Sequence, residues 1–373
     1  MNELQLKDLY DGFRDPNTIR ALAKSITDEA ASLTEPLFIM EVCGGHTHTI
    51  MKYGLKQLLP KNIDFIHGPG CPVCIMPKER IDHAIALSQV EDAILLTLGD
   101  MIRVPGSKSS LAEERAKGYD IRALYSPMDA IKIARENPDK KVIFFAIGFE
   151  TTTPMTAALL AQVEKLHITN LYFHINHVLV PPAVDAIMAD GQAKINAFIG
   201  PAHVSVITGA KIYEQQPIKY DTPVVVSGFE PVDVLQSILM IVRQKNLKRC
   251  EMEIQYTRSV TREGNVKAQA MIEKFMKPRA HFRWRGIGDI PDSALELREK
   301  YAAYDAEKIF ADILPTEPID DHKLCICGTI LKGLAKPNDC KVFGTACTPN
   351  KPMGSCMVSS EGACNAYYRY AEI

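Results

Sequence analysis

The chain has 373 residues, of which 46% are hydrophobic and 24% are charged, as in an ordinary globular protein of roughly two or three domains. Its 43 basic and 45 acidic side chains give a formal net charge of −2. This balance lacks the excess of positive charge that favours binding to nucleic acid or to an anionic membrane surface, so we expect neither partner.

The first part of the chain carries an amphipathic pattern, and a regular alternation of strand and helix patterns follows. Asp15-Pro16 is a helix start signal, and a helix is predicted over 16–33. From residue 37, short apolar runs alternate with helical patterns, which predicts βαβ units and parallel sheets. The predicted strands are 37–42, 63–67, 93–98, 121–126, 141–147, 171–176, 197–200 and 223–227, and helices between them include 78–88, 127–136, 152–165, 181–189 and 232–244.

The polar stretch 135–140 predicts a boundary between two α/β domains, 37–137 and 138–245. Gly-Phe-Glu occurs at 148–150 and again at 228–230, a weak internal echo of two halves. After about residue 245 the pattern changes: 265–276 is helical, 281–290 is mixed, and 316–373 is rich in Gly, Pro and Cys. We interpret 246–373 as a cofactor-holding region.

The ten cysteines are interpreted through the expected cellular location. Charged residues occur throughout the N-terminus, and no apolar run approaches the ~18 residues that a membrane span needs, so we expect a cytoplasmic protein without a signal peptide. Cytosolic cysteines stay reduced, which favours metal or redox chemistry over a disulfide framework.

Chemically distinctive residues follow directly after predicted strands. Because ligands bind at the carboxyl ends of strands in parallel sheets, we expect thiols, imidazoles and carboxylates to gather along these edges. The segments are Cys43-Gly-Gly-His-Thr-His48, Gly68-Pro-Gly-Cys-Pro-Val-Cys74, Gly99-Asp100, Gly148-Phe-Glu150, Pro201-Ala-His-Val-Ser205 and Gly228-Phe-Glu-Pro231.

Two of these segments contain thiols. Cys71 and Cys74 form a CxxC pair, which can close a disulfide or chelate one metal ion, or provide half of a zinc site that the tail completes. Cys43 lies near His46 and His48, and its thiolate can converge with the CxxC pair on one iron. For the two histidines, hydrogen bonding at a helix N-terminus is the alternative.

The remaining candidates are Glu150, Glu230 and His203. The carboxylates can accept protons, orient an imidazole or anchor a loop, and the alternative for each is a helix N-terminal carboxylate favoured by the macrodipole. His203 has a purely structural role as its alternative. No phosphate-binding or dinucleotide-binding glycine motif and no H-E-x-x-H pattern occurs in the sequence.

The tail has the spacing Cys325-x-Cys327-x12-Cys340-x6-Cys347-x8-Cys356-x7-Cys364. Four thiolates are the usual ligands of a [4Fe–4S] cluster, although the compact ferredoxin spacing is absent. Structural zinc stays open as an alternative.

Taken together and in order, these motifs resemble the HypD family of hydrogenase maturation factors. The tail contributes Cys327-Gly328, Cys340-x-x-Phe-Gly-x-x-Cys347 and Met357-Val-Ser-x-Glu-Gly-x-Cys364 to the match, which runs from about residue 37 to the end. One departure is Ala202, where the family pattern has Gly; it requires only that the backbone avoid positive φ.

The resemblance implies two thioredoxin-like or Rossmann-like α/β domains and a small [4Fe–4S] domain, with the N-terminal segment 1–36 packing against the last of these. It further implies a scaffold and redox assembly factor, on which the Fe(CN)₂CO group of [NiFe] hydrogenase is built in complex with a HypC-like chaperone and a HypE-like cyanide donor.

By the same resemblance, Cys43 is the leading iron ligand, and Cys71 and Cys74 are the redox-active pair beside it. The expected cluster ligands are Cys327, Cys340, Cys347 and Cys364, whereas Cys325 and Cys356 fall outside the family pattern. Two other functions stay open: a [4Fe–4S]-dependent thiol–disulfide reductase, and a zinc-stabilised binding module without chemistry.

Overall fold

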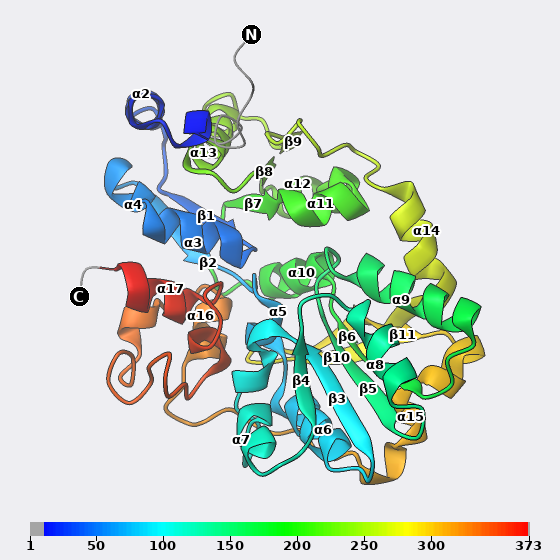
Figure 1. The fold of residues 1–373 in the computed structure, drawn as a ribbon. Helices are drawn as coiled ribbons and strands as arrows, with labels where there is room; N and C mark the ends of the chain where they lie inside the picture. The colour runs from blue at the N-terminus through cyan, green and yellow to red at the C-terminus, as the bar shows by residue number, and fades with distance from the viewer. Residues whose placement is uncertain (1–10, 372–373) are drawn as a thin grey trace.

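The computed structural model describes residues 11–371 and contains two parallel sheets, one antiparallel hairpin and a cysteine-rich tail (Figure 1). The first sheet has the strand order β2-β1-β7-β8-β9, and every pairing in it is parallel. Its strands are β1 (Leu37–Glu41), β2 (Ile63–His67), β7 (Ala197–Pro201), β8 (Val224–Ser227) and β9 (Met252–Ile254).

The second sheet has the order β4-β3-β5-β6 and is also parallel. Its central strand β5 is buried along nearly its whole length, as expected for a parallel strand covered on both faces. The strands are β3 (Ala93–Leu98), β4 (Ile121–Leu124), β5 (Lys141–Gly148) and β6 (Leu171–His177). The predicted α/β class and its eight strands are therefore confirmed.

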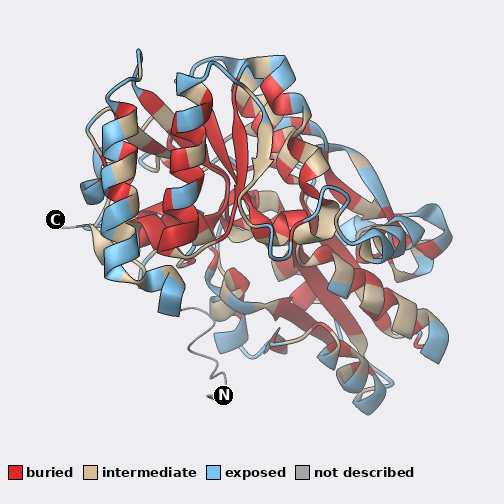
Figure 2. Ribbon diagram, turned by 90° about the horizontal axis from the view of Figure 1, so that it is seen from above, coloured by how far each residue is buried: buried red, intermediate tan, exposed pale blue. Residues whose placement is uncertain are grey.

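Helices cover both sheets, and the buried strands lie between exposed outer helix faces (Figure 2). No helix in the span 11–371 is long and apolar enough to cross a membrane. The helices before the tail are α2 (Pro16–Ala30), α3 (Gly44–Lys52), α4 (Leu55–Leu58), α5 (Pro72–Ile75), α6 (Lys78–Ser88), α7 (Leu111–Ala116), α8 (Asp129–Glu136), α9 (Thr153–Leu166), α10 (Val180–Asp190), α11 (Ala202–Thr208), α12 (Gln215–Tyr220), α13 (Pro231–Asn246) and α14 (Val266–Phe275), with short 3-10 turns η1 (Gly12–Arg14), η2 (Gly99–Arg103) and η3 (Ala210–Tyr213).

The predicted domain boundary at 137/138 is wrong. Strand β3 pairs with β5 across it, and β1 pairs with β7. The chain thus builds two strands of the first sheet, makes the whole second sheet over 93–177, and returns to finish the first. Periodicity identifies a strand but does not identify its partner, so a polar loop between two strands of one sheet has the same sequence pattern as a domain boundary.

The predicted packing of the N-terminal helix is also wrong in its partner. Asp15 caps α2 by accepting a hydrogen bond of 2.7 Å from the backbone N–H of Thr18. The apolar face of α2, with Ile26 fully buried, packs on α13, where Glu29 pairs with Arg243 at 2.8 Å. The helix therefore belongs with the first sheet and not with the tail.

The mixed segment 281–290 lies in a long antiparallel hairpin of β10 (Met276–Trp284) and β11 (Gly288–Leu297) that the sequence analysis missed. The hairpin packs on β6 and α10, and the indole of Trp284 donates to the hydroxyl of Ser293 at 2.8 Å.

The tail, orange to red in Figure 1, packs α17 on α3 and η7 on α5, so it covers the two thiol-containing loops. The elements after the hairpin are η4 (Glu299–Tyr304), α15 (Ala306–Ile309), η5 (Ala311–Ile313), α16 (Cys327–Leu331), η6 (Pro337–Asp339), η7 (Ser355–Met357) and α17 (Ala363–Tyr370).

Candidate functional site

Cys43 lies at the carboxyl end of β1, where it precedes α3 in extended conformation. Its side chain is 2% exposed, and burial raises the pKa of its thiol well above the ordinary value. The Sγ atom lies 3.5 Å from Nε2 of His203, which follows β7. Because β1 and β7 are neighbours, the parallel sheet brings these two residues together as the strand ends predict.

Phe229 forms the aromatic wall of this site. Its ring stacks on His46 with centroids 4.6 Å apart and on His203 with centroids 4.7 Å apart. It also restricts Gly45, where a Cβ would lie 2.9 Å from the Phe229 ring. Phe229 belongs to the repeated Gly-Phe-Glu segment, but its role depends on side-chain packing that the sequence does not show.

The imidazole of His46 is fully buried, and burial lowers its pKa to about 4, so the ring is neutral at pH 7. Its Nε2 lies 3.0 Å from the carbonyl oxygen of Gly228, and since a carbonyl only accepts, Nε2 carries the proton. Nδ1 is then an acceptor, and it has no hydrogen-bond partner among the residues that the structure describes. The unprotonated Nδ1 of His46 can therefore accept a hydrogen bond or bind a metal ion through its lone pair.

Glu150 and Tyr213 complete the buried polar group. One oxygen of Glu150 accepts a hydrogen bond of 2.8 Å from the backbone N–H of Val180. Burial raises the pKa of Tyr213, and the charges of Glu150 and Cys43 raise it further, which places the phenol near both. Burial also lowers the pKa of His203 to about 4, so this imidazole is neutral at pH 7, and the charges that act on Cys43 come from the carboxylates of Glu361 and Glu41.

Burial raises the pKa of Glu150 to about 7 from 4.5. The folded chain therefore keeps a proton that the unfolded chain loses, and stability should fall as the pH rises from 4.5 through about 7. We expect Glu150→Gln, whose amide oxygen keeps the bond to Val180, to remove this decline and to be more stable than the parent at pH 8 by on the order of 3 kcal/mol. Urea unfolding at pH 5 and pH 8 measures the difference in free energy of unfolding between the two proteins. A difference that does not change with pH would contradict the raised pKa of Glu150.

Two candidates lie elsewhere. Glu230 is the N-cap of α13, and its carboxylate pairs with Arg14 at 2.5 and 2.7 Å, so it anchors the N-terminal segment. His48 packs edge-on against Tyr370 of α17. Glu230 therefore matches its alternative as a carboxylate at a helix N-terminus, whereas the ring of His48 contacts the tail.

The Gly-Pro-Gly segment before the CxxC pair passes directly over Cys43. The backbone N–H of Gly44 donates to the carbonyl of Gly70 at 3.0 Å, and a Cβ on Gly70 would lie 2.5 Å from the Cα of Cys43. Only glycine allows the two backbones this approach.

Gly70→Ala is therefore expected to push the CxxC loop away from Cys43 and to destabilise the fold by about 1–3 kcal/mol, the usual cost of overpacking. Gly12→Ala is the matched control, since none of the residues that the structure describes lies within 4 Å of a Cβ there. Chemical denaturation of both variants makes the comparison, and equal stability of the two would show that the loops are not in contact.

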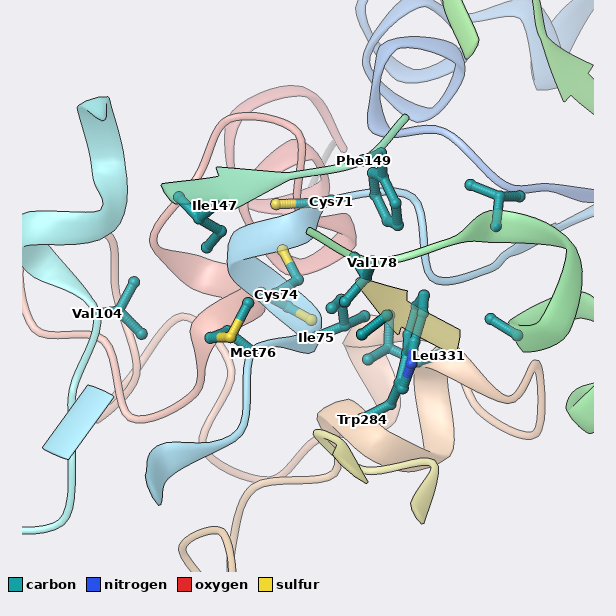
Figure 3. Packing of buried hydrophobic residues seen from close by; sticks show 14 of the residues in the cluster. Cys71, Cys74, Ile75, Met76, Val104, Ile147, Phe149, Val178, Trp284 and Leu331 are labelled. Carbon is teal, nitrogen blue, oxygen red and sulfur yellow. The ribbon is translucent and has the colours of Figure 1, made fainter. Parts of the chain in front are cut away.

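Cys71 is the N-cap of the short helix α5 and Cys74 lies within it, and their exposed fractions are 2% and 1%. Figure 3 shows them among buried hydrophobic residues, with Ile147 of β5 on one side and Phe149, Trp284 and Leu331 on the other. Burial raises the pKa of Cys74, and its contacts with the thiols of Cys356 and Cys71 raise it further. The CxxC pair thus lies in a dry environment and touches a tail cysteine.

Cys356 connects the two groups of thiols. It is fully buried, and hydrogen bonds from the thiols of Cys327 and Cys74 lower its pKa to about 6. The hydroxyl of Ser355 donates to the carbonyl of Cys74 at 2.5 Å and holds the tail against α5. The thiols of Cys71, Cys74, Cys356 and Cys327 are therefore neighbours in this order, and we call this series the thiol path.

Cys327 is the centre of the tail group. Its thiol contacts those of Cys325 and Cys364, and a Cβ on Gly354 would lie 2.5 Å from the sulfur of Cys325 and 2.7 Å from that of Cys327. Cys347 interacts electrostatically with Cys327 and Cys325, and its sulfur accepts a hydrogen bond of 3.3 Å from the backbone N–H of Met353.

Cys340 lies apart, with its sulfur 3.8 Å from the carbonyl of Leu324 at the surface. The structure therefore places Cys325 and Cys356, which fall outside the family pattern, inside the thiol group. Within the described span, no three His, Cys, Asp or Glu side chains are arranged around one point as metal ligands. Five tail thiols nevertheless gather in one region, and thiolates are the donors of both iron–sulfur clusters and structural zinc.

Comparisons with known proteins show the family of the chain. The family model HypD, described as the hydrogenase formation hypA family, matches residues 17–371. The chain is 50% identical to "Hydrogenase maturation factor HypD" of Azotobacter vinelandii, covering 96% of each chain. It is 51% identical to the protein of that name from Rhizobium leguminosarum bv. viciae, covering 96% of this chain and 94% of the relative, and 43% identical to that of Escherichia coli, covering 97% and 98%. The chain therefore belongs to the HypD family, whose curated relatives are hydrogenase maturation factors.

Proposed function

We propose that this chain is a hydrogenase maturation factor that holds an iron ion as its cargo at Cys43 while the ion acquires cyanide and CO. The observation that carries the proposal is the buried contact between Cys43 and His203 beneath the Phe229 ring, directly under the CxxC loop. A thiolate is a ligand that suits low-valent iron, and the surrounding apolar wall keeps water away from it.

The neutral state of the nearby imidazoles supports this role. His46 and His203 both have pKa values near 4, so neither places a positive charge beside an incoming metal ion. His46, with Nδ1 unprotonated and unpartnered in the described part of the chain, is positioned to accept a hydrogen bond or donate a lone pair. An HypC-like chaperone would complete the iron site, and a HypE-like protein would supply cyanide.

The thiol path is proposed to deliver electrons to the CxxC pair. A disulfide between Cys71 and Cys74 needs two electrons and two protons to become two thiols. Cys356, which lies beside Cys74, is placed to attack that disulfide, forming a Cys74–Cys356 mixed disulfide and releasing Cys71 as a thiolate. Two electrons and two protons then reduce the mixed disulfide to the thiols of Cys74 and Cys356. A [4Fe–4S] cluster held by tail thiols supplies single electrons when it is bound.

The cluster ligands expected from the resemblance are Cys327, Cys340, Cys347 and Cys364. Cys327 lies beside both Cys356 and Cys325, so as a ligand it would bring the cluster next to the thiol path, and Cys325 is the informative comparison. A thiol–disulfide reductase alone is not favoured, because it leaves the buried Cys43 and His46 group without a task.

The test is anaerobic reconstitution of each tail Cys→Ser variant with iron and sulfide, followed by visible spectroscopy and iron and sulfide analysis. Serine at each of four ligand positions is expected to reduce the cluster content strongly, whereas Cys250→Ser, a half-buried cysteine beside Pro217, is expected to keep it. If Cys325→Ser loses the cluster and Cys327→Ser retains it, then Cys325 is the ligand in place of Cys327. Zinc with no iron in the unaltered protein would contradict the cluster.

A further inference from the structure

The ring of Phe229 lies between the Cys43 thiol and the surface of the protein. Cys43 is 2% exposed, whereas Phe229 is half-buried. A Cβ on Gly45 would lie 2.9 Å from the Phe229 ring and 3.6 Å from the Cys43 sulfur, so the ring is beside the thiol. The same ring stacks on His46 and His203. The position of this one ring therefore decides how accessible the thiol is from this side.

The backbone on both sides of Phe229 is held by the carboxylate of Asp233, in the first turn of α13. Asp233 is fully buried, and it accepts hydrogen bonds from the backbone N–H of Glu230 at 3.4 Å and from the side-chain amide of Gln255 at 2.9 Å. The amide oxygen of Gln255 in turn accepts a bond of 3.1 Å from the backbone N–H of Gly228. The residues before and after Phe229 are thus tied to one buried negative charge.

Arg258 supplies the positive charge that this carboxylate needs. Its Nη2 group donates to both oxygens of Asp233, at 2.9 Å each. The guanidinium also lies over two aromatic rings, with its central carbon 4.1 Å from the ring centroid of Tyr256 and 4.0 Å from that of Phe13. Rings in this arrangement attract the cation and shield it from water, which strengthens its pairing with the buried carboxylate.

The sheet places Arg258 close to Phe229, because the two residues follow the neighbouring strands β9 and β8. The N-terminal segment adds two contacts from the distant turn η1. Phe13 covers the guanidinium of Arg258, and Arg14 pairs with Glu230 at 2.5 and 2.7 Å. A buried carboxylate that loses its cation is strongly destabilised, so the backbone around Phe229 depends on Arg258 for its present position.

We propose that Arg258 is a positioning residue for the Phe229 ring and thereby controls access to the Cys43 thiol. The effect passes through Asp233 to the backbone on either side of Phe229, and Phe13 stabilises the guanidinium from the N-terminal segment. This inference rests on the proposed function, because the thiol that the ring covers is the proposed anchor of the iron ion. An iron ion that reaches Cys43 from this side has to pass the ring.

The first measurement follows the ring itself. Nuclear magnetic resonance spectra of the full chain, labelled with carbon-13 in its histidine rings, are recorded without oxygen. Phe229→Leu removes the ring current and so identifies the signals of the stacked His46 and His203. Arg258→Met, which keeps the length of the side chain and removes its charge, is expected to move the same two signals part of the way toward their positions in Phe229→Leu.

The second measurement follows access to the thiol, by timed alkylation with iodoacetamide and mass spectrometry. Labelling of a buried thiol requires local opening, and loss of a charged hydrogen bond favours opening, so Cys43 should react about tenfold faster in Arg258→Met. Cys356, which is fully buried in the tail, should react at the parent rate. A purely structural role of Arg258 would speed the labelling of both thiols alike and leave the histidine signals of the folded chain in place.

Arg262→Met is the matched control, because Arg262 lies in the same loop but forms an exposed ion pair with Glu214. It should change neither the signals nor the rates. If circular dichroism shows that Arg258→Met does not fold, Phe13→Ala replaces it, with shifts in the same direction and a smaller rise in the Cys43 rate.

Unchanged histidine signals, or an unchanged Cys43 rate, in the variant that folds would overturn the inference. Neither measurement needs bound iron. A parent chain that binds no iron would therefore refute the proposed function, whereas unchanged signals and rates in the variants would refute the role of Arg258 alone.

Discussion

Cys356→Ser should leave the cluster region intact and yet isolate the CxxC pair from its reductant. Cys356 is the one thiol in the described chain that contacts both Cys74 and Cys327, and a serine hydroxyl cannot form the mixed disulfide that thiol exchange requires. Because the thiols act as a unit, we expect the reduction rate of a Cys71–Cys74 disulfide to fall on the order of a hundredfold or more.

The measurement starts from oxidised protein, adds dithionite anaerobically, and quenches with an alkylating agent at set times before mass spectrometry. Labelling of Cys71 and Cys74 follows the reaction. Cys250→Ser, far from the path and beside Pro217, serves as the control and should react at the parent rate. Equal rates in Cys356→Ser and the parent would show that electrons reach the CxxC pair by another way.

Glu307→Gln should be the most destabilising single change of a charged residue outside the thiol region. Its two oxygens bind Arg80 at 2.7 and 3.1 Å and Arg279 at 3.0 and 2.7 Å, and this fork joins α6, β10 and α15. Arg80 is only 5% exposed and also donates to Asn176 and Ile175 of β6. Removing the carboxylate leaves two guanidinium groups uncompensated, which costs about 3–5 kcal/mol.

The same contact predicts sensitivity to acid. Burial acts to raise the pKa of Glu307, but the charges and hydrogen bonds of Arg80 and Arg279 outweigh it and hold the pKa far below 4.5. A lowered carboxylate pKa contributes stability that is present above the ordinary value and is lost as the pH falls below it. Urea unfolding at pH 7 and pH 4 should show that the difference in free energy of unfolding between the parent and Glu307→Gln is smaller at pH 4. Glu299→Gln, which breaks an exposed ion pair with Lys308, should not measurably change the free energy of unfolding. Equal destabilisation by Glu299→Gln and Glu307→Gln would show that the buried ion pairs of Glu307 contribute no more than an exposed one.

The sequence predicts the strands well because parallel strands are buried on both faces and show as short apolar runs. The predicted and observed strands agree within one or two residues from 37–42 to 223–227, and the chemically distinctive residues do follow them. The sequence predicts that Cys43 and His203 each follow a strand of a parallel sheet. It does not predict that they meet, because that depends on the pairing of β1 with β7.

What the sequence could not predict depends on contacts between distant segments. The sheet order, the packing of α2 on α13 and the β10–β11 hairpin are long-range pairings that no local periodicity specifies. Tyr213 and Arg258 lie in segments without motifs, and the place of Cys356 between Cys74 and Cys327 follows from how the tail packs on α5.

The central claim is that Cys43 anchors an iron ion that carries cyanide and CO. The chain should be co-expressed with an HypC-like partner, purified without oxygen, and examined by infrared spectroscopy in the cyanide and CO stretching region, with Cys43→Ala and Cys250→Ala prepared in parallel. We predict stretching bands in the parent and in Cys250→Ala and none in Cys43→Ala. Bands of equal strength in Cys43→Ala, or a blank parent spectrum from a sample shown to contain its partner and its cluster, would contradict the account.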